Sequence, residues 1–270
     1  MRPSRYLQNV LVGASALLFA GAQFIPNTNG SGPVLTAAVS FVSGTRDGNV
    51  APSGDRRSTV AGVTRVALDA LTGAVRPLSR PQALERAFTS YFAYKSAHPA
   101  QVRKPYLYFV DYGLPSTTPR GYVFDMDSLK VVDGPFTVAH GRGSSGARDG
   151  VPTRFSNVEG SHATSLGLYV AQATYGFRGK MAGRPYRSVG LRLMGVSRGF
   201  NDNALERRVV AHGAPYVTST KAGRSEGCPA MEPARAAQLL PKLADGGMVF
   251  LFAPDEEWMT RDPWLASVSE

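Results

Sequence analysis

The chain has 270 residues, and 30 Lys and Arg side chains against 20 Asp and Glu give it a formal net charge of +10. A hydrophobic fraction of 43% excludes a wholly disordered chain, and the length is ample for a domain with its own hydrophobic core. A single cysteine excludes both a disulfide framework and a Cys-rich zinc module, and four histidines argue against a His-rich metal site. We therefore expect no metal and no other cofactor.

The N-terminus has the features of a secretory signal peptide. Arg2 and Arg5 precede a short apolar stretch at residues 10–22, which ends in Ala-Gly-Ala, small residues at the positions that a signal peptidase reads. The alternative is a membrane anchor, but the stretch is shorter than the ~20 residues of a spanning helix. We predict a signal peptide at residues 1–22 and an exported protein, in the periplasm or cell wall, that has no membrane attachment after cleavage.

The segment after the signal peptide is rich in Gly, Ser, Thr, Asn and Pro and shows little periodicity. This composition is typical of a linker, and we assign residues 23–78 to a flexible one. The basic residues of the chain are scattered and form no run, and no nucleic-acid-binding motif is present. A nucleic acid is therefore not an expected partner.

Helix signals occur twice. Residues 79–98 have Ser79 as a candidate cap, Pro81 in the first turn, and apolar residues at three- and four-residue spacing. Residues 233–243 begin with a proline and are followed by two glycines. Each signal predicts one helix.

Most of the remaining sequence is typical of short strands separated by Gly- and Pro-rich turns. We expect strands at residues 106–111, 121–125, 130–132, 136–139, 166–170, 191–195, 208–211 and 248–252. The predicted fold class is therefore mainly β (α+β) with a few helices. It forms a domain at residues 79–254, followed by a C-terminal tail at 255–270.

The only cysteine, Cys228, stands in a polar segment flanked by glycine. A lone cysteine in an exported protein is a buried small hydrophobe, a partner in an intermolecular disulfide or a reactive thiol. A buried cysteine normally lies in an apolar run, whereas Gly227 permits a turn that directs successive N–H groups toward one point. The amides of Gly227 and Cys228 could then form an oxyanion hole, although Pro229 has no N–H to give. This context favours the reactive thiol.

His212 is the candidate base for that thiol. It follows an apolar strand, and a strand end and a returning loop can bring it next to Cys228. The alternative is a structural histidine at the end of a strand. All four histidines precede Cys228, which excludes the papain-like order of cysteine before histidine. Near the thiol, Arg224 favours the thiolate and Glu226 opposes it.

His212 and the Ser-Glu-Gly-Cys element at residues 225–228 resemble the signature of the YkuD-type L,D-transpeptidases, a His followed by Ser/Thr-x-Gly-Cys. Several stretches, taken together and in this order, resemble the murein L,D-transpeptidase catalytic domain. They are residues 139–144 (AHGRGS), 154–157 (RFSN), 160–169 (GSHATSLGLY), 193–195 (LMG), 210–217 (VAHGAPYV) and 223–230 (GRSEGCPA).

The resemblance implies a β-sandwich-like catalytic fold with the cysteine loop in a groove. It also implies cross-linking of peptidoglycan through the third residue of a stem peptide, with donor and acceptor stems as partners. In this family the nucleophile corresponds to Cys228 and the general base and acid to His212. Gly213 stands where a backbone carbonyl orients the histidine, and Gly227 stands at an oxyanion amide.

Two positions depart from the family pattern. Glu226 stands where the family often has His, and Pro229 begins a stretch without the usual Arg that holds a substrate carboxylate. We therefore expect Arg224 or Arg142 to bind that carboxylate. The other substrate-binding candidates are Ser225, Glu226, His140 and Asn157. For His140 and Asn157 the alternative is a purely structural role.

Three outcomes remain open from the sequence. A neighbouring stem that accepts the acyl group gives a 3-3 cross-link with release of D-Ala, whereas water as acceptor makes the same site an L,D-carboxypeptidase. The departures at Glu226 and Pro229 motivate a third, a cell-wall-binding scaffold without turnover. A sortase-like enzyme is disfavoured by the short interval from His212 to Cys228.

Residues 141–146 match the G-x-G-x-x-G dinucleotide fingerprint, but no helix signal follows them, which argues against a nucleotide site.

Overall fold

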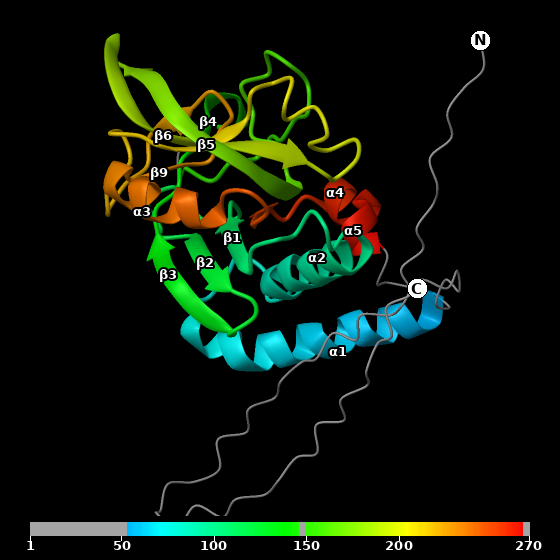
Figure 1. Cartoon of the computed structure of the whole chain (residues 1–270). Helices are drawn as coiled ribbons and strands as arrows, with labels where there is room; N and C mark the ends of the chain where they lie inside the picture. The colour runs from blue at the N-terminus through cyan, green and yellow to red at the C-terminus, as the bar shows by residue number, and fades with distance from the viewer. Residues whose placement is uncertain (1–52, 146–149, 267–270) are drawn as a thin grey trace, which may run out of the picture. The chain divides into compact units, whose positions relative to one another are not determined.

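The computed structural model describes residues 53–145 and 150–266 (Figure 1). The predicted signal peptide lies outside the described residues, as does the first part of the predicted linker. Within the described ranges, no helix combines the length and the apolar character that crossing a membrane requires. The prediction of a mainly β fold with a few helices is confirmed.

Eight strands form one sheet in the order β3-β2-β1-β10-β5-β6-β7-β9. Their bounds are β1 Tyr106–Asp111, β2 Gly121–Asp125, β3 Lys130–Phe136, β5 Gly167–Met181, β6 Arg184–Gly195, β7 Val210–Gly213, β9 Ala230–Met231 and β10 Met248–Phe252. The fully buried β10 is near the centre, parallel to β1 and antiparallel to β5. A separate small sheet pairs β4 (His140–Gly141) in parallel with β8 (Arg224–Ser225).

Two helices form where the sequence predicts them. α2 (Ala83–Ala97) begins later than expected, because Ser79 does not cap it. Instead the Ser79 amide and hydroxyl both donate to the Asp111 carboxylate, at 2.7 and 2.6 Å. α3 (Pro233–Leu243) contacts β1 on one side and β6 and β7 on the other (Figure 1). It therefore packs inside the curve of the sheet, where its apolar face is buried.

The structure corrects the linker prediction, because α1 occupies Ser53–Leu71. Val60, Thr64, Ala67 and Leu71 recur at helical spacing and are all buried, and α1 packs against α2. This stripe contains small and polar residues rather than a row of large apolar ones. For that reason the composition resembles a linker although the segment forms a helix.

Residues 255–266 of the predicted C-terminal tail also fold onto the domain. Asp255 stands just before α4 (Glu256–Arg261), and its carboxylate caps the helix by accepting the Trp258 N–H at 2.9 Å. Trp258 is only 1% exposed, contacts the rings of Phe250 and Phe252, and donates its indole N–H to Asp262 at 2.8 Å. The short α5 (Pro263–Ala266) follows. This segment is therefore part of the core and not a tail.

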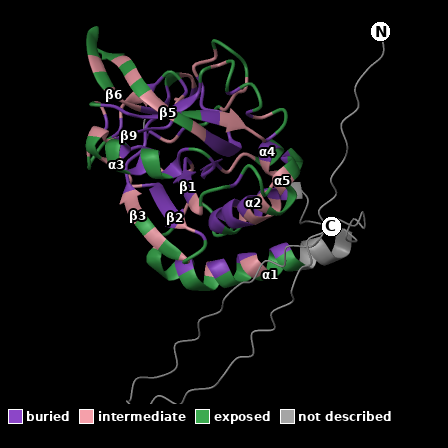
Figure 2. Cartoon of the chain, in the orientation of Figure 1, coloured by how far each residue is buried: buried purple, intermediate pink, exposed green. Residues whose placement is uncertain are grey.

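β5 and β6 extend well beyond the predicted strands and form a two-stranded ribbon. We call residues 174–191 the outer ribbon; its pairs run from Thr174 opposite Leu191 to Met181 opposite Arg184. It begins after a register shift between Ala171 and Thr174 and projects from the rest of the sheet (Figure 1). Its end is mostly exposed (Figure 2).

Replacing the buried indole tests whether the C-terminal helices belong to the core. Trp258→Ala should lower the free energy of unfolding by about 3–5 kcal/mol, because it leaves a cavity beside Phe250 and Phe252. The measurement is a denaturant titration followed by circular dichroism. Val158→Ala, at a side chain that is 66% exposed, is the control and should stay within about 0.5 kcal/mol of wild type. Equal midpoints for both variants would contradict this packing.

Candidate active site

The segment of residues 225–228 forms a tight turn around the cysteine. The Ser225 hydroxyl accepts the Gly227 N–H at 3.2 Å and donates to the Cys228 carbonyl at 2.6 Å. Gly227 has φ +123°, and a Cβ at this position would lie 2.9 Å from the Ala163 carbonyl oxygen. The turn therefore requires glycine here, both for its backbone angle and for the close approach. Ser225, predicted to contact substrate, holds the turn.

Strand pairing places the cysteine beside the histidine in the fold. β7, which ends with His212 and Gly213, runs parallel to β9, which begins just after Cys228. The His212 N–H donates to the Pro229 carbonyl at 3.2 Å, and the Val210 N–H contacts the Cys228 sulfur at 3.5 Å. His212 thus lies on β7, and Cys228 lies in the turn that leads into the paired strand β9.

His212 is held in one tautomer. Its Nδ1 lies 3.0 Å from the Gly213 carbonyl oxygen, which can only accept, so Nδ1 carries the proton and Nε2 presents a lone pair. The side chain is 3% exposed, and Phe177 of the outer ribbon stacks on the imidazole with ring centroids 4.1 Å apart. Burial lowers the pKa of His212 to about 4, although the hydrogen bond to Gly213 opposes this. The imidazole is therefore neutral at pH 7.

Gly213 stands at the position that the family resemblance implies for orienting the histidine, and the packing explains why it is glycine. A Cβ there would lie 2.9 Å from both Ala236 Cβ and Pro233 Cα at the start of α3. Such contacts would push β7 away from α3. The absent side chain thus keeps the carbonyl that orients His212 in its place.

Opposing effects act on the pKa of the Cys228 thiol. Burial raises the pKa of Cys228 above its ordinary value, and the negative charge of Glu226 raises it slightly further. The Val210 N–H and the guanidinium of Arg207 lower it. Because burial has the largest effect, the resting thiol keeps its proton at neutral pH.

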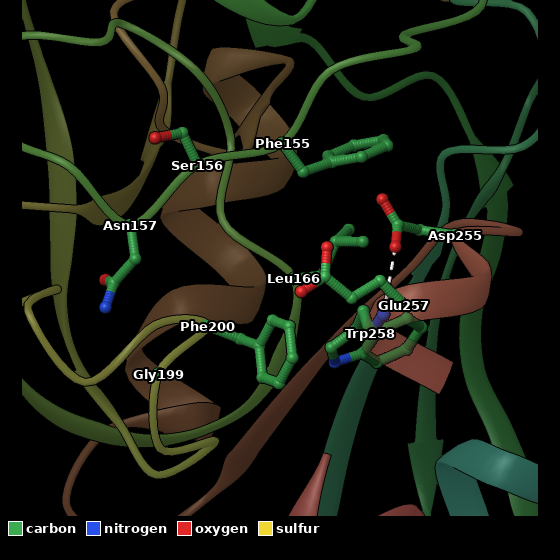
Figure 3. A pocket seen from close by; sticks show the side chains of 9 residues that line it. All are labelled: Phe155, Ser156, Asn157, Leu166, Gly199, Phe200, Asp255, Glu257 and Trp258. Carbon is green, nitrogen blue, oxygen red and sulfur yellow. Dashed lines mark hydrogen bonds between the residues drawn. The ribbon is translucent and has the colours of Figure 1, made fainter. Parts of the chain in front are cut away.

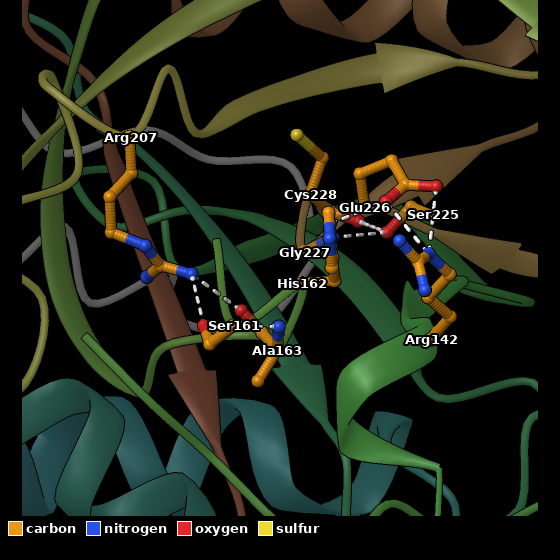
Figure 4. A network of polar contacts seen from close by, with 9 residues as sticks. All are labelled: Arg142, Ser161, His162, Ala163, Arg207, Ser225, Glu226, Gly227 and Cys228. Carbon is orange, nitrogen blue, oxygen red and sulfur yellow. Dashed lines mark hydrogen bonds and ion pairs between the residues drawn. The ribbon is translucent and has the colours of Figure 1, made fainter. Parts of the chain in front are cut away.

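Arg207 is a site residue that the sequence did not reveal. Its guanidinium donates to the carbonyls of Ser156 and Ala163, each at 2.8 Å, and to the Ser161 hydroxyl at 3.3 Å. These acceptors are neutral, so within the described part of the chain no carboxylate pairs with this half-buried cation. In the sequence Arg207 is one scattered basic residue among many, and only the fold brings it to the Cys228 turn (Figure 4).

Glu226 links two groups on the exposed side of the turn. Its carboxylate lies 2.8 Å from Arg142 Nε and 2.5 Å from His162 Nδ1 (Figure 4). The Glu226 side chain is 66% exposed, so this cluster is in contact with solvent. Arg142, a predicted carboxylate-binding residue, is thus paired with a carboxylate of the protein itself.

Arg224, the other predicted carboxylate-binding residue, is engaged within the fold. Its Nε donates to the Ser145 hydroxyl at 2.5 Å and its Nη1 to the Ser116 hydroxyl at 3.1 Å. Nη1 also lies within 3.4 Å of two nearby backbone carbonyls. These contacts fix the strand before the turn, which is a structural role.

His140 lies inside the protein. It is fully buried, and its Nδ1 lies 2.9 Å from Nη2 of the equally buried Arg120. Burial lowers the pKa of His140 to about 3, with Arg120 and Arg224 adding to the effect. A neutral His140 therefore accepts from Arg120. This arrangement is the structural alternative that the sequence left open, and it corrects the prediction of a substrate contact.

Asn157 is directed to a different part of the surface. Its amide donates to Asp202 at 2.7 Å, and its side-chain oxygen accepts the Asn203 N–H at 3.2 Å. It lines a pocket of about 220 Å³ whose apolar wall includes Phe155 and Phe200 (Figure 3). Cys228 does not line this pocket, and substrate binding by Asn157 stays a prediction.

Comparisons with known proteins identify the family of the chain. The sequence matches the family model of the L,D-transpeptidase catalytic domain over residues 77–252. No curated protein matches. Similar solved structures include an L,D-transpeptidase from Mycobacterium smegmatis, with 16% identity, a TM-score of 0.33, and coverage of 55% of this chain and 59% of that one. Another is an L,D-transpeptidase from Stackebrandtia nassauensis, with 14% identity, a TM-score of 0.33, and coverage of 74% and 90%.

The chain thus spans less than two thirds of the length of the Mycobacterium smegmatis structure. The family model, in contrast, covers more than half of this chain, from before α2 to the end of β10, and includes both Cys228 and His212. The chain belongs to the L,D-transpeptidase catalytic domain family.

Proposed function

We propose that this protein is an exported cysteine L,D-transpeptidase that acts on peptidoglycan stem peptides and forms 3-3 cross-links through an acyl-enzyme on Cys228, with release of D-Ala. One observation carries the proposal. Cys228 lies in the turn that leads into β9, the strand paired with the His212 strand β7, and His212 has its Nδ1 proton fixed by Gly213, which leaves Nε2 as a base. Membership of the family supports the choice of substrate.

The reaction starts from a neutral pair. With the His212 pKa near 4 and the thiol pKa raised, the proton resides on sulfur, so His212 removes it as the sulfur attacks the carbonyl of the third stem residue. The imidazolium then gives this proton to the amine of D-Ala as the C–N bond breaks. An acceptor amine next attacks the thioester, His212 takes the amine proton, and the departing thiolate recovers it.

The oxyanion formed at each attack requires hydrogen-bond donors. The Gly227 N–H, which the sequence suggested for this role, is bound to the Ser225 hydroxyl. No described residue accepts the Cys228 N–H. We therefore assign the oxyanion to the Cys228 amide, a donor of a kind that contributes roughly 3–4 kcal/mol to such reactions.

Arg207 is the best candidate for the substrate carboxylate, in place of Arg142 and Arg224. The carboxylate of the terminal D-Ala lies on the residue next to the bond that is cleaved, so the cation that binds it must be close to Cys228. Arg207 meets this condition, and its hydrogen bonds to described residues all go to neutral acceptors, whereas Arg142 is paired with Glu226. A guanidinium also matches a carboxylate in geometry.

The neutral pair predicts how thiol reactivity depends on pH. The rate at which iodoacetamide alkylates Cys228 should rise roughly tenfold per pH unit through pH 7 and beyond pH 8, because only the thiolate reacts. Intact-protein mass spectrometry measures the rate directly, since the chain has one cysteine. A plateau that is already reached between pH 5 and 7 would contradict the assignment, because it would indicate a preformed thiolate–imidazolium pair.

Two neighbouring arginines provide the contrast within the same experiment. Arg207→Gln removes the cation that favours the thiolate and should slow alkylation several-fold at each pH. Arg208→Gln changes an exposed side chain and should leave the profile as in wild type. If both variants gave the same profile, Arg207 would have no electrostatic role at the thiol.

The activity is tested with disaccharide-tetrapeptide muropeptides. Incubation with the mature protein should yield cross-linked dimers that have lost one D-Ala, and Cys228→Ala should yield none, because it lacks the nucleophile. Mass spectrometry of the products is the measurement. Tripeptide monomers alone would replace the proposal with a carboxypeptidase. If folded wild-type protein gave no product, the proposal would be replaced by that of a cell-wall-binding scaffold without turnover.

A further inference from the structure

The outer ribbon lies in the longest acid-free part of the domain. Residues 160–201 contain no Asp or Glu, although six Lys and Arg side chains occur there. Arg178, Lys180, Arg184 and Arg187 all belong to the outer ribbon, and all are exposed. The ribbon projects beyond the rest of the sheet, and its end is largely exposed (Figures 1 and 2). It is therefore a concentrated positive surface.

The two faces of the ribbon differ in chemistry. Side chains alternate between the faces of a strand, and directly paired residues share a face. Phe177 stacks on His212, so its face is directed to the active site. Arg178 and Lys180 belong to the other face, and Arg187, which pairs with Arg178, lies there too. Arg178, Lys180 and Arg187 are thus directed away from the histidine, outside the machinery that we assign to catalysis.

Within residues 53–145 and 150–266, Arg178, Lys180 and Arg187 have no charged or hydrogen-bonding side-chain partner. Arg178 and Arg187 are direct cross-strand partners, an arrangement of like charges that destabilises a sheet. Among the described residues, neither they nor Lys180 forms an ion pair or a side-chain hydrogen bond. Their positive charge is therefore available to an external anion.

A shallow hollow lies between the two arginines. Its volume is about 310 Å³, and it is bounded by Arg178, Pro185, Tyr186 and Arg187. Two guanidiniums on one concave surface can each bind a carboxylate through paired N–H donors. The hollow is thus suited to an acidic group carried on a larger molecule.

We propose that the outer ribbon is a second binding site for the acidic stem peptides of the polymer substrate, distinct from the stem that reacts at Cys228. The proposal rests on the proposed function, because it takes peptidoglycan as the substrate. A polymer strand whose stem reaches His212 passes next to the ribbon, and carboxylates recur on the neighbouring stems. The cationic face therefore holds the polymer while the aromatic face covers the reacting pair.

Binding to purified peptidoglycan sacculi tests this site. The full chain carries Cys228→Ala in every sample, so that turnover does not affect binding. The ribbon variant combines Arg178→Gln, Lys180→Gln and Arg187→Gln. The control variant combines Arg65→Gln, Arg80→Gln and Lys130→Gln, which remove the same charge from exposed positions elsewhere. Each exposed ion pair contributes roughly twofold, so the ribbon variant should bind roughly eightfold more weakly in a pelleting assay. The control should bind like the parent.

Converting the carboxylates of the sacculi to amides identifies the ligand. Amidation should weaken binding of the parent by a larger factor than binding of the ribbon variant, which keeps only the carboxylate contact that we assign to Arg207. Equal binding by the ribbon and control variants would overturn the proposal, as would parent binding that amidation does not change. Loss of binding by the ribbon variant only on phosphatidylglycerol-containing phosphatidylcholine vesicles would assign the face to a membrane and overturn it too.

A soluble substrate separates this proposal from the proposed function. With Cys228 intact, the ribbon variant should release D-Ala from disaccharide-tetrapeptide at the wild-type rate, because a single muropeptide has no neighbouring stem. Failure of wild-type protein to release D-Ala would overturn the proposed function. A slower rate for the folded ribbon variant on this substrate would place the cations at the reacting stem and overturn the second site.

Discussion

The hydroxyl of Ser225 holds the cysteine turn closed, since it accepts from the Gly227 amide and donates to the Cys228 carbonyl. A turn fixed in this way brings the next residues into register with β7, where the His212 N–H meets the Pro229 carbonyl. Gly227 then packs against the Ala163 carbonyl, which Arg207 also binds. Cys228, His212 and Arg207 therefore owe their relative positions to one small hydrogen-bonded loop.

The same packing determines the proton positions. Burial disfavours charge on both Cys228 and His212, so the pair rests in its neutral form. In the mechanism that we propose, charge separates only during attack. The Gly213 carbonyl selects the tautomer, and Phe177 closes one side of the imidazole. Because Phe177 belongs to the outer ribbon, the element that we propose to hold the polymer also shapes the environment of the base.

Features with a local signal could be predicted from the sequence. Apolar runs identify β1 and β10, and glycine before the lone cysteine identifies the turn. Features that depend on contacts between distant segments could not. Trp258 resembles part of a tail until Phe250 and Phe252 surround it. Arg207 resembles an ordinary surface charge until the fold supplies the Ala163 carbonyl. The length of the outer ribbon was missed because its glycines and arginines lack the alternation of a half-buried strand.

The covalent intermediate is the most direct test of Cys228 and His212 as a working pair. The protein is mixed briefly with a synthetic tetrapeptide stem, quenched in acid and weighed intact by mass spectrometry. The mass should increase by that of the stem without its terminal D-Ala, and peptide mapping should locate the adduct on Cys228. Folded wild-type protein that acquires no adduct, or an adduct that persists in Cys228→Ala, would contradict the assignment of the nucleophile.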